Sequence, residues 1–260
     1  MMREGPGMSV EGAQAVRRAL TILHCFRDNG PALGASDLGR RLDLPTSTAH
    51  RLARTLVASG FLEQDPATSR FRLGPSIVEL GQLSFHQRGL HRAVPELTQL
   101  ARVTSTTVDL ALRGGNEVLI LVGDSVRREA GIGLRRPLHS TALGKVLLAW
   151  SPDPDLAGLG PLPALTDRTI VDPSELKSEL DLVRDQGYAV NDGESAAGVR
   201  TLAVPILDHA GNARYALALR ATPELITIRR LDWYLTQART CAKALEILLL
   251  PPEERPTPAL

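Results

Sequence analysis

An abrupt break between two short amphipathic segments, followed at once by a two-stranded pattern, constrains the fold of this chain more than any other feature. The first segment predicts a helix over 37–42 with Ser36 as its N-cap, and residues 43–45 then break the helical pattern. Apolar residues at helical spacing over 49–57 predict a second helix. Alternating residues on either side of a polar turn within 61–73 predict a hairpin. A short helix, a turn, a longer helix and a hairpin in this order predict a winged helix-turn-helix.

The start of the second helix carries residue types that suit contact with double-stranded DNA. Pro45 fits a helix start, and the short hydroxyl side chains after it lie beside exposed N–H groups that can bind phosphate. Basic residues off the apolar stripe can reach a groove, and His50 among them is expected to set specificity. The alternative is a plain amphipathic helix with a solvated face. The predicted DNA-binding residues are Thr46, Ser47, Thr48, His50, Arg51, Arg54, Arg70 and Arg72.

The chain after about residue 90 mixes helical and strand patterns, which predicts an α+β domain with a mostly antiparallel sheet. The last helical pattern keeps one face apolar from Ile228 to Leu249, so we expect that helix to pack on a sheet. Helices are predicted over 91–104, 141–149, 174–186 and 224–249, and strands over 107–113, 117–123, 188–190, 200–207 and 214–220.

Composition excludes several classes of protein. The chain has 30 Lys and Arg against 29 Asp and Glu, which excludes a histone-like polycation and an acidic disordered chain. Cys25 and Cys241 are too few and too far apart for a disulfide framework, so we expect core thiols and a reducing, cytoplasmic setting. The sequence has no apolar run of ~18 residues and no secretory signal, and we expect no membrane partner. No motif predicts a cofactor or a metal site.

Three separated stretches of the chain resemble the IclR family of bacterial transcriptional regulators. Residues 35–74 resemble its DNA-binding domain, residues 137–145 match its His-x-Thr-Ala-x-Gly-Lys stretch, and residues 187–208 match its C-terminal signature region. The three stretches occur in the order of the family. Asp43 stands where the family usually has a glycine in the turn, and aspartate tolerates a left-handed backbone better than most residues.

The resemblance implies a two-domain regulator with flexible tails over 1–11 and 251–260. A winged helix-turn-helix over 12–74 would be joined by a linker helix over 75–90 to a GAF-like, effector-binding, antiparallel-sheet domain over 91–250. It further implies a homodimer or homotetramer that binds a partly palindromic operator in double-stranded DNA. A small effector, expected to be an organic acid, would modulate that binding. Whether the protein represses or activates stays open.

The resemblance also places eight residues at the effector site. It implies that the backbone N–H groups of Ala142 and Leu143 and the side chains of Asn191 and Thr201 hold the ligand. His139 is expected to order the effector loop. Ala218 and Arg220 stand where the family often has acidic or small polar residues. Ala218 cannot replace a hydroxyl side chain, and Arg220 is the more informative of the two differences. Arg220 would clamp a carboxylate if it faces the pocket, and would be a solvated or interface arginine if it faces the surface. The eight residues are His139, Thr141, Ala142, Leu143, Asn191, Thr201, Ala218 and Arg220.

Two other functions compete with this interpretation. One is an enzyme that acts on a small metabolite through the C-terminal domain, with the DNA-binding domain as an appendage. The other is a scaffold whose GAF-like domain only dimerises. His139 and Lys145 invite a catalytic role, but the chain has no Gly-x-Ser-x-Gly elbow, no His-Glu-x-x-His and no Walker loop. We therefore expect a regulator without catalytic residues.

Overall fold

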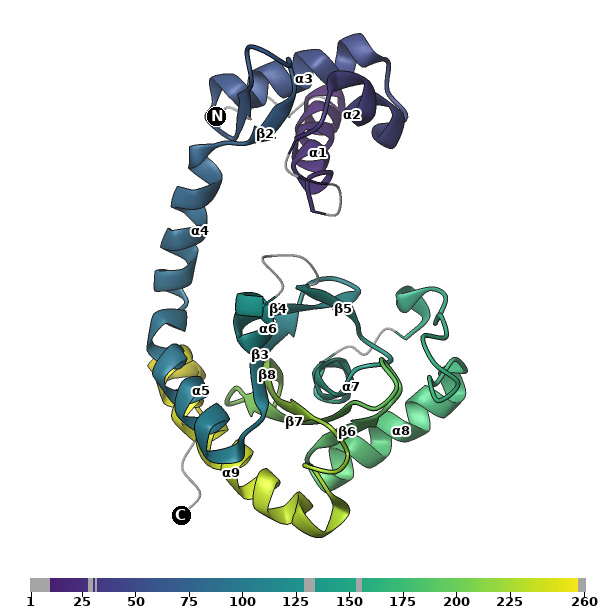
Figure 1. Cartoon of the computed structure of the whole chain (residues 1–260), viewed down its shortest axis with the longest axis vertical. Coiled ribbons are helices and arrows are strands. Elements are labelled where there is room, and N and C mark those ends of the chain that lie inside the picture. Colours follow the sequence, from purple (N-terminus) through teal and green to yellow (C-terminus); the bar gives the residue numbers. More distant parts are fainter. Residues whose placement is uncertain (1–9, 28–29, 31, 129–133, 153–155, 257–260) are drawn as a thin grey trace, which may run out of the picture. The chain divides into compact units, whose positions relative to one another are not determined.

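The structure is a computed structural model that describes residues 10–27, 30, 32–128, 134–152 and 156–256. Its internal contacts divide the chain into two compact units, Met1–Gln87 and Arg88–Leu260 (Figure 1). The predicted domain boundaries at 74 and 90 stay a prediction.

The first unit contains a helix-turn-helix followed by a hairpin. The described strands β1 and β2 pair antiparallel, with Leu62 opposite Leu73. Leu33 adds an isolated bridge to Phe71, which ties the segment before α2 to the hairpin. This order of elements confirms the predicted winged helix-turn-helix. The elements are α1 (Val10–His24), α2 (Ala35–Leu42), α3 (Thr46–Ala58), β1 (Leu62–Gln64), β2 (Phe71–Leu73) and α4 (Pro75–Gln87).

The turn between α2 and α3 depends on two backbone positions. Asp43 has a left-handed backbone, with φ 50 and ψ 50, and its N–H donates to the Gly39 carbonyl. The expectation that aspartate can serve at this position is therefore confirmed. At Gly39, one helical turn before Asp43, a Cβ would lie 2.8 Å from the Leu44 carbonyl oxygen, so this position needs glycine. The predicted N-cap is wrong: α2 begins after Gly34, whose N–H donates to the Asp37 carboxylate at 3.1 Å, rather than after Ser36.

The core of the first unit lies between α1, α2, α3 and the hairpin. The predicted apolar stripe of α3 is buried from Ala49 to Leu56. On α1 the residue that anchors the helix is Ile22, which is fully buried, whereas Val16 and Leu20 are 56% and 53% exposed. Helical spacing alone could not tell which apolar face of α1 meets α3. The buried residues are Ile22, Leu33, Leu38, Ala49, Leu52, Ala53, Leu56, Leu62 and Phe71.

The second unit is an α+β domain built on one antiparallel sheet, as predicted. The described strands form a six-stranded sheet in the order β5-β4-β3-β8-β7-β6. The sequence missed β5 and α6, which are too short for a periodic pattern. The elements are α5 (Leu90–Thr104), β3 (Thr107–Arg113), β4 (Glu117–Gly123), α6 (Asp124–Arg128), β5 (Arg135–Pro137), α7 (Ala142–Ala149), α8 (Pro173–Gln186), β6 (Ala189–Asp192), β7 (Arg200–Leu207), β8 (Ala213–Ala221) and α9 (Leu231–Leu249).

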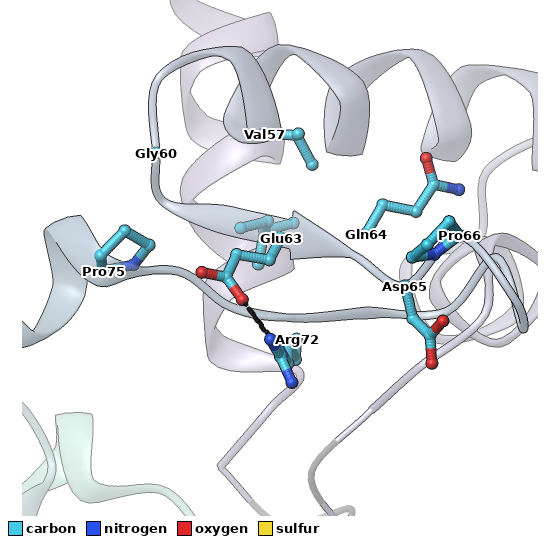
Figure 2. A pocket seen from close by; sticks show the side chains of 9 residues that line it. Val57, Gly60, Glu63, Gln64, Asp65, Pro66, Arg72 and Pro75 are labelled. Atoms are coloured by element: carbon cyan, nitrogen blue, oxygen red, sulfur yellow. Dashed lines mark hydrogen bonds and ion pairs between the residues drawn. The ribbon is translucent and has the colours of Figure 1, made fainter.

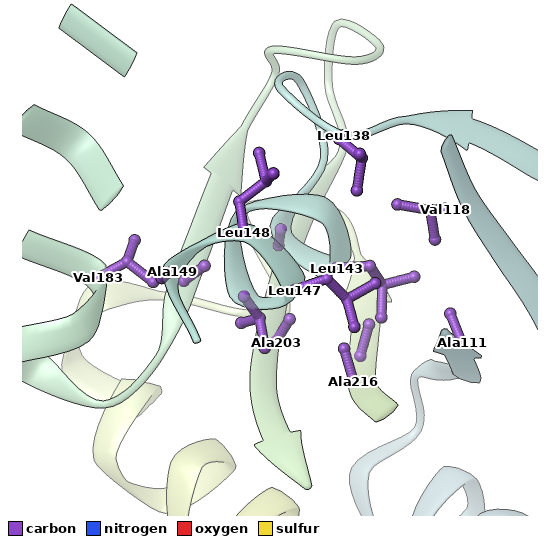
Figure 3. Packing of buried hydrophobic residues seen from close by; sticks show 14 of the residues in the cluster. Ala111, Val118, Leu138, Leu143, Leu147, Leu148, Ala149, Val183, Ala203 and Ala216 are labelled. Carbon is purple, nitrogen blue, oxygen red and sulfur yellow. The ribbon is translucent and has the colours of Figure 1, made fainter. Parts of the chain in front are cut away.

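Helices cover both faces of this sheet. The helices α5 and α9 pack together on one face, and α7 lies within the curve of the other (Figure 1). All eight residues of α7 are buried. Figure 3 shows its leucines packed against small side chains of the sheet, among them Ala111, Ala203 and Ala216. Because alanines leave room on that face, α7 approaches the strands closely enough for residues at its N-terminus to meet side chains on the sheet.

Several element boundaries differ from the prediction. The helix α9 begins at Leu231 rather than at 224, because a 3₁₀ turn over Ile228–Arg230 precedes it. Ile228 is 81% exposed, so its expected place on the apolar face was wrong. The helix α4 ends at Gln87 because Gly89 has a φ of 70, and α5 then begins at Leu90. Residues Pro252–Glu254, within the segment expected to be a flexible tail, form a 3₁₀ turn.

Candidate DNA-binding and effector sites

The N-terminus of α3 presents hydroxyl groups to solvent. Thr46 and Ser47 are exposed and Thr48 is half-buried. Pro45 is the N-cap and forms no side-chain cap, so the first N–H groups of α3 are not capped by a side chain. Within the part of the chain that is described, no hydrogen bond joins these three hydroxyls to another residue. The arrangement therefore leaves hydroxyl and backbone donors together at one helix end, where phosphate oxygens can accept them.

The basic residues of α3 lie on its exposed side, as the stripe predicted. Arg51 is exposed, and no residue of the described chain hydrogen-bonds its guanidinium. Arg54 differs, because its Nη1 donates to the Gln64 side chain of β1 at 2.9 Å. His50 is exposed, with its ring 6.0 Å from the Phe71 ring. Of the three, Arg51 is the exposed cation that could bind a partner molecule without giving up a side-chain hydrogen bond within the described part of the unit.

The two arginines of the hairpin have partners that the sequence did not reveal. Arg70 donates to the Ala32 carbonyl and meets the Asp37 carboxylate at 3.3 Å, which ties the hairpin to the start of α2. Arg72 pairs with Glu63 across the hairpin, with Nη2 and Oε2 2.6 Å apart. Figure 2 shows this pair at a hollow between the end of α3, the hairpin and the start of α4.

The carboxylate of Asp37 is the polar centre of this N-terminal network. The Gly34 N–H, and after it Arg70 and Arg40, hold the pKa of Asp37 below its ordinary value, against the opposing effect of desolvation. An ionised Asp37 therefore caps α2 and fixes Arg70 at once. Arg70, which was expected to contact DNA, therefore also joins the hairpin to the start of α2.

In the second unit, the residues before α7 hold the loop in place. His139 is buried, and its Nε2 lies 3.0 Å from the Pro163 carbonyl oxygen. Thr141 is the N-cap of α7: its hydroxyl accepts from the Gly144 N–H at 3.0 Å and donates to the Pro137 carbonyl at 2.9 Å. Both side chains are thereby used within the loop. The backbone N–H groups of the first two helical residues, Ala142 and Leu143, point along the helix axis at this end.

Four polar side chains form a row across the sheet on the side that faces α7. Opposite partners on neighbouring strands are Thr107 and Arg220, Arg220 and Thr201, and Thr201 and Asn191. Directly opposite residues place their side chains on the same face of a sheet. We call Thr107, Arg220, Thr201 and Asn191 the polar row. Three of the expected effector residues thus come from three strands to one place, and Thr107, which no sequence motif indicated, joins them.

The next row along these strands belongs to the core. Ala218 lies opposite Ala203, which in turn lies opposite Ala189, and all three pack in the cluster around α7. Asp109, opposite Ala218, is the charged member of this row and is 5% exposed. Ala218 therefore contributes packing at this position, where the family resemblance implied a ligand contact.

The side chain of Asn191 makes three hydrogen bonds within the fold. Its Nδ2 donates to the Ser140 carbonyl at 2.6 Å and to the Ser195 hydroxyl at 2.8 Å. Its Oδ1 accepts from the Glu194 N–H at 2.8 Å. An amide side chain has two donors and two acceptor positions, so one acceptor position is left for another molecule. The remaining members of the polar row are half-buried, and their side-chain donors are better placed to bind a ligand.

Arg220 faces the side of the sheet on which α7 lies. Its Nη2 donates to the Ser125 hydroxyl at 3.0 Å, and Thr107 and Thr201 flank it on the neighbouring strands. A guanidinium has five N–H donors in a fixed fork, and a carboxylate can accept two of them side by side. A half-buried arginine between two hydroxyl side chains is suited to bind a small organic anion.

Lys145, in the middle of α7, has a role that the motif did not indicate. Its side chain is 1% exposed, and its Nζ donates to Glu179 of α8 at 2.8 Å and to Glu194 at 2.6 Å. Burial raises the pKa of the Glu194 carboxyl, and Lys145 opposes that shift. Lys145 therefore joins α7, α8 and the turn after β6 in one buried ionic cluster.

The described residues contain no cluster that could hold a metal ion and no helix that could span a membrane. No three or more His, Cys, Asp or Glu side chains in that part of the chain are grouped to hold an ion. No described helix is both long and apolar enough to span a bilayer. Both cysteines are free thiols; Cys241 is buried, and burial raises its pKa to about 12, while Cys25 is half-buried.

Comparison with known proteins identifies relatives over both units. Residues 15–66 match the IclR helix-turn-helix domain, and residues 86–247 match the C-terminal domain of the bacterial transcriptional regulator IclR. The HTH-type transcriptional regulator XynR of Escherichia coli is 34% identical over 214 residues, which cover 79% of this chain and 85% of that protein. The glycerol operon regulatory protein of Streptomyces coelicolor is 37% identical over 201 residues, which cover 75% and 79%.

A solved structure extends the likeness to three dimensions. The crystal structure of an IclR homologue from Microbacterium hydrocarbonoxydans, complexed with 4-hydroxybenzoate, aligns with a TM-score of 0.77 at 29% identity. The alignment covers 90% of this chain and 98% of the other. Matches over both units, in sequence and in fold, show that this chain belongs to the IclR family of bacterial transcriptional regulators.

Proposed function

We propose that this regulator binds operator DNA through α3 as a homo-oligomer, and that a small carboxylate bound at the polar row controls this binding. The observation that carries the proposal is the half-buried Arg220, set between Thr107 and Thr201 on the face of the sheet that meets α7. Membership of a family of transcriptional regulators supports the DNA-binding part. The relative crystallised with 4-hydroxybenzoate supports an organic acid as the class of effector.

In this proposal the hydroxyls of Thr46, Ser47 and Thr48 position α3 on the phosphate backbone. Arg51 reaches the groove, and His50 tunes specificity. Arg54, Arg70 and Arg72 contact phosphate with the N–H groups that their internal partners leave unused. Arg51 is expected to contribute most, because it breaks no bond within the unit when it binds DNA.

The DNA-binding proposal can be tested on operator fragments selected with the full chain from genomic DNA. Arg51→Ala should weaken binding by roughly 1–3 kcal/mol if the arginine contacts a base. If it contacts a phosphate, the slope of log K against log salt should fall by about 1 instead. Arg102→Ala, an exposed arginine of α5, is the matched control for the lost charge. Wild-type affinity of Arg51→Ala at all salt concentrations would remove Arg51 from the binding surface.

The first unit also offers a surface for a second copy of the chain. None of the thirteen residues of α4 is buried, and its Val78, Leu80 and Leu83 are 62%, 50% and 49% exposed. Apolar surface of this kind is covered in an assembly, and a two-fold dimer would present two α3 helices to a palindrome. Light scattering with chromatography should therefore show a dimer or tetramer, and Leu83→Glu should shift it toward monomer. An unchanged oligomer would place the contact elsewhere.

The effector part of the proposal is tested by thermal unfolding of the full chain against a panel of organic acids. A specific ligand raises stability by RT ln(1 + [L]/Kd). Effector should also change operator affinity, because a ligand that binds two conformations unequally shifts the balance between them. Binding of an acid without any change in operator affinity would refute the coupling.

The proposal includes no catalytic step. The ammonium of Lys145 is held by two carboxylates, and His139 is buried against a carbonyl oxygen, which supports structural roles for both. Turnover of an organic acid or amide by the purified chain would overturn this part.

A further inference from the structure

A buried aspartate stands where the neighbouring strands carry alanine. Asp109 lies in one row with Ala218, Ala203 and Ala189, and it is 5% exposed. Burial of a carboxylate costs free energy unless hydrogen bonds compensate it. The sheet even makes room for it: at Gly123, a Cβ would lie 2.5 Å from the Asp109 Oδ1. The packing of the core does not require this carboxylate, because alanine fills the same place on three other strands.

The hydrogen bonds of Asp109 lead directly to Arg220. Ser125, 1% exposed, donates its backbone N–H to Oδ1 of Asp109 at 2.9 Å and its hydroxyl to Oδ2 at 2.5 Å. The Ser125 hydroxyl in turn accepts from Nη2 of Arg220 at 3.0 Å. An arginine can only donate, so the serine oxygen must accept from it, and the single hydroxyl proton must then go to the carboxylate. The direction of the whole chain of bonds is therefore fixed.

This chain of hydrogen bonds occupies one of the five N–H donors of the Arg220 guanidinium. Asp109 and Arg220 form no direct ion pair among the described residues, so Ser125 separates the two charges. One N–H of Arg220 is taken by Ser125, and no other acceptor for the remaining four is present in the described part of the chain. A carboxylate ligand needs two parallel N–H groups, and these are still free.

We propose that Asp109 and Ser125 are positioning residues that hold the Arg220 guanidinium between Thr107 and Thr201, so that its free N–H groups select a carboxylate over a neutral ligand. This inference rests on the proposed effector site at the polar row. Without the anchor, a long arginine side chain samples many rotamers and loses that freedom again when the ligand binds. Asp109 and Ser125 hold the arginine side chain in place before the ligand arrives, so less conformational entropy is lost on binding, as in other preorganised sites.

The test compares acids with their amides on the full chain. The probes are acetate and 4-hydroxybenzoate against acetamide and 4-hydroxybenzamide, with Kd measured by calorimetry or by the shift in melting temperature. The wild type should prefer each acid to its amide. Ser125→Ala should weaken binding of the acids about 10- to 150-fold, the value of one lost hydrogen bond to a charged group, and leave the amides unchanged. Arg220→Met, which removes the cation, should abolish the preference, and Ser178→Ala, on exposed α8 surface, should not alter it.

A second variant separates loss of the positioning role from simple destabilisation of the fold. Ser125→Ala leaves the buried carboxylate with one donor fewer, whereas Asp109→Ala with Ser125→Ala removes the carboxylate and continues the alanine row. The double variant should fold and show the same weakened preference for acids.

The outcomes separate the inference from the proposed function. A wild type without preference for acid over amide refutes the effector site and the inference together. A wild type that prefers acids, an Arg220→Met variant that does not, and serine and double variants that keep the wild-type preference would leave the effector site standing and overturn the positioning role.

Discussion

Replacing Lys145 with methionine should destabilise the Arg88–Leu260 unit by about 3–5 kcal/mol at pH 8, the usual cost of removing one partner from a buried ion pair. The Lys145 side chain is 1% exposed, and those of its partners Glu194 and Glu179 are 11% and 25% exposed. Methionine has a similar length, so the substitution removes the charge without opening a large cavity. Because Glu179 keeps part of its hydration, most of the cost should come from Glu194.

The loss should depend on pH in a defined direction. Burial already raises the pKa of Glu194 in the wild type, and removal of Lys145 takes away the charge that opposes this shift. A carboxyl with a raised folded pKa contributes stability below its unfolded pKa, and this is lost as pH rises through the folded pKa. Glu194 can take up a proton in the variant as pH falls, so the deficit relative to wild type should shrink from pH 8 to pH 5.

Urea unfolding followed by tryptophan fluorescence measures this deficit. The chain has two tryptophans, Trp150 and Trp233, and both lie in the second unit. Lys177→Met is the matched control, because Lys177 pairs with Asp181 on the exposed side of α8, where both side chains are 68% exposed; it should cost no more than about 0.5 kcal/mol. Glu194→Gln in the Lys145→Met background should restore part of the stability. A Lys145→Met loss as small as that of the control, or one that grows toward pH 5, would refute the reasoning.

Three further substitutions test local geometry. Gly144→Ala should destabilise the second unit by about 3 kcal/mol or more, because its Cβ would lie 2.1 Å from the Leu138 carbonyl oxygen; the same fluorescence assay measures it, and a stable variant would contradict the close approach. Asp43→Val should destabilise the first unit by about 1–2 kcal/mol, because its backbone is left-handed, while Asp43→Gly should be tolerated; circular dichroism reports both, and equal effects would refute the strain. Asp37→Asn should remove a stabilising contribution that is full above the ordinary carboxyl pKa and is lost as pH falls through the lowered pKa, so wild type and variant should converge below about pH 4 in acid titration.

Local periodicity located most elements from the sequence. The pattern of apolar residues placed α3, β3, β4 and β7, and the stripe of α3 separated buried Leu52 from exposed Arg51. Such patterns succeed because side-chain direction repeats every 3.6 residues in a helix and every two in a strand. They failed where an element is shorter than its period can show, as at β5, and where an apolar residue stays exposed within its unit, as at Ile228.

Membership of the proposed effector site depends on strand register. Thr107 and Arg220 are far apart in the sequence and become neighbours only because β3 pairs with β8 in one particular register. A shift of β3 by one residue would turn Thr107 to the face of the sheet opposite Arg220. Asp109 and Ser125 escaped notice for the same reason, since no spacing in the chain connects them with Arg220.

The sequence by itself determined the order of elements, the exposed basic side of α3 and the resemblance to a family of regulators, because these follow from local patterns and motifs. Only the tertiary structure decided which polar side chains already have partners within the fold. Asn191 donates to the Ser140 carbonyl, Lys145 pairs with two carboxylates, and Arg70 pairs with Asp37. Hydrogen-bond partners are set by where distant segments cross, and no local pattern encodes that crossing. The structure therefore narrows the candidate effector residues to the few whose donors remain free, with Arg220 first among them.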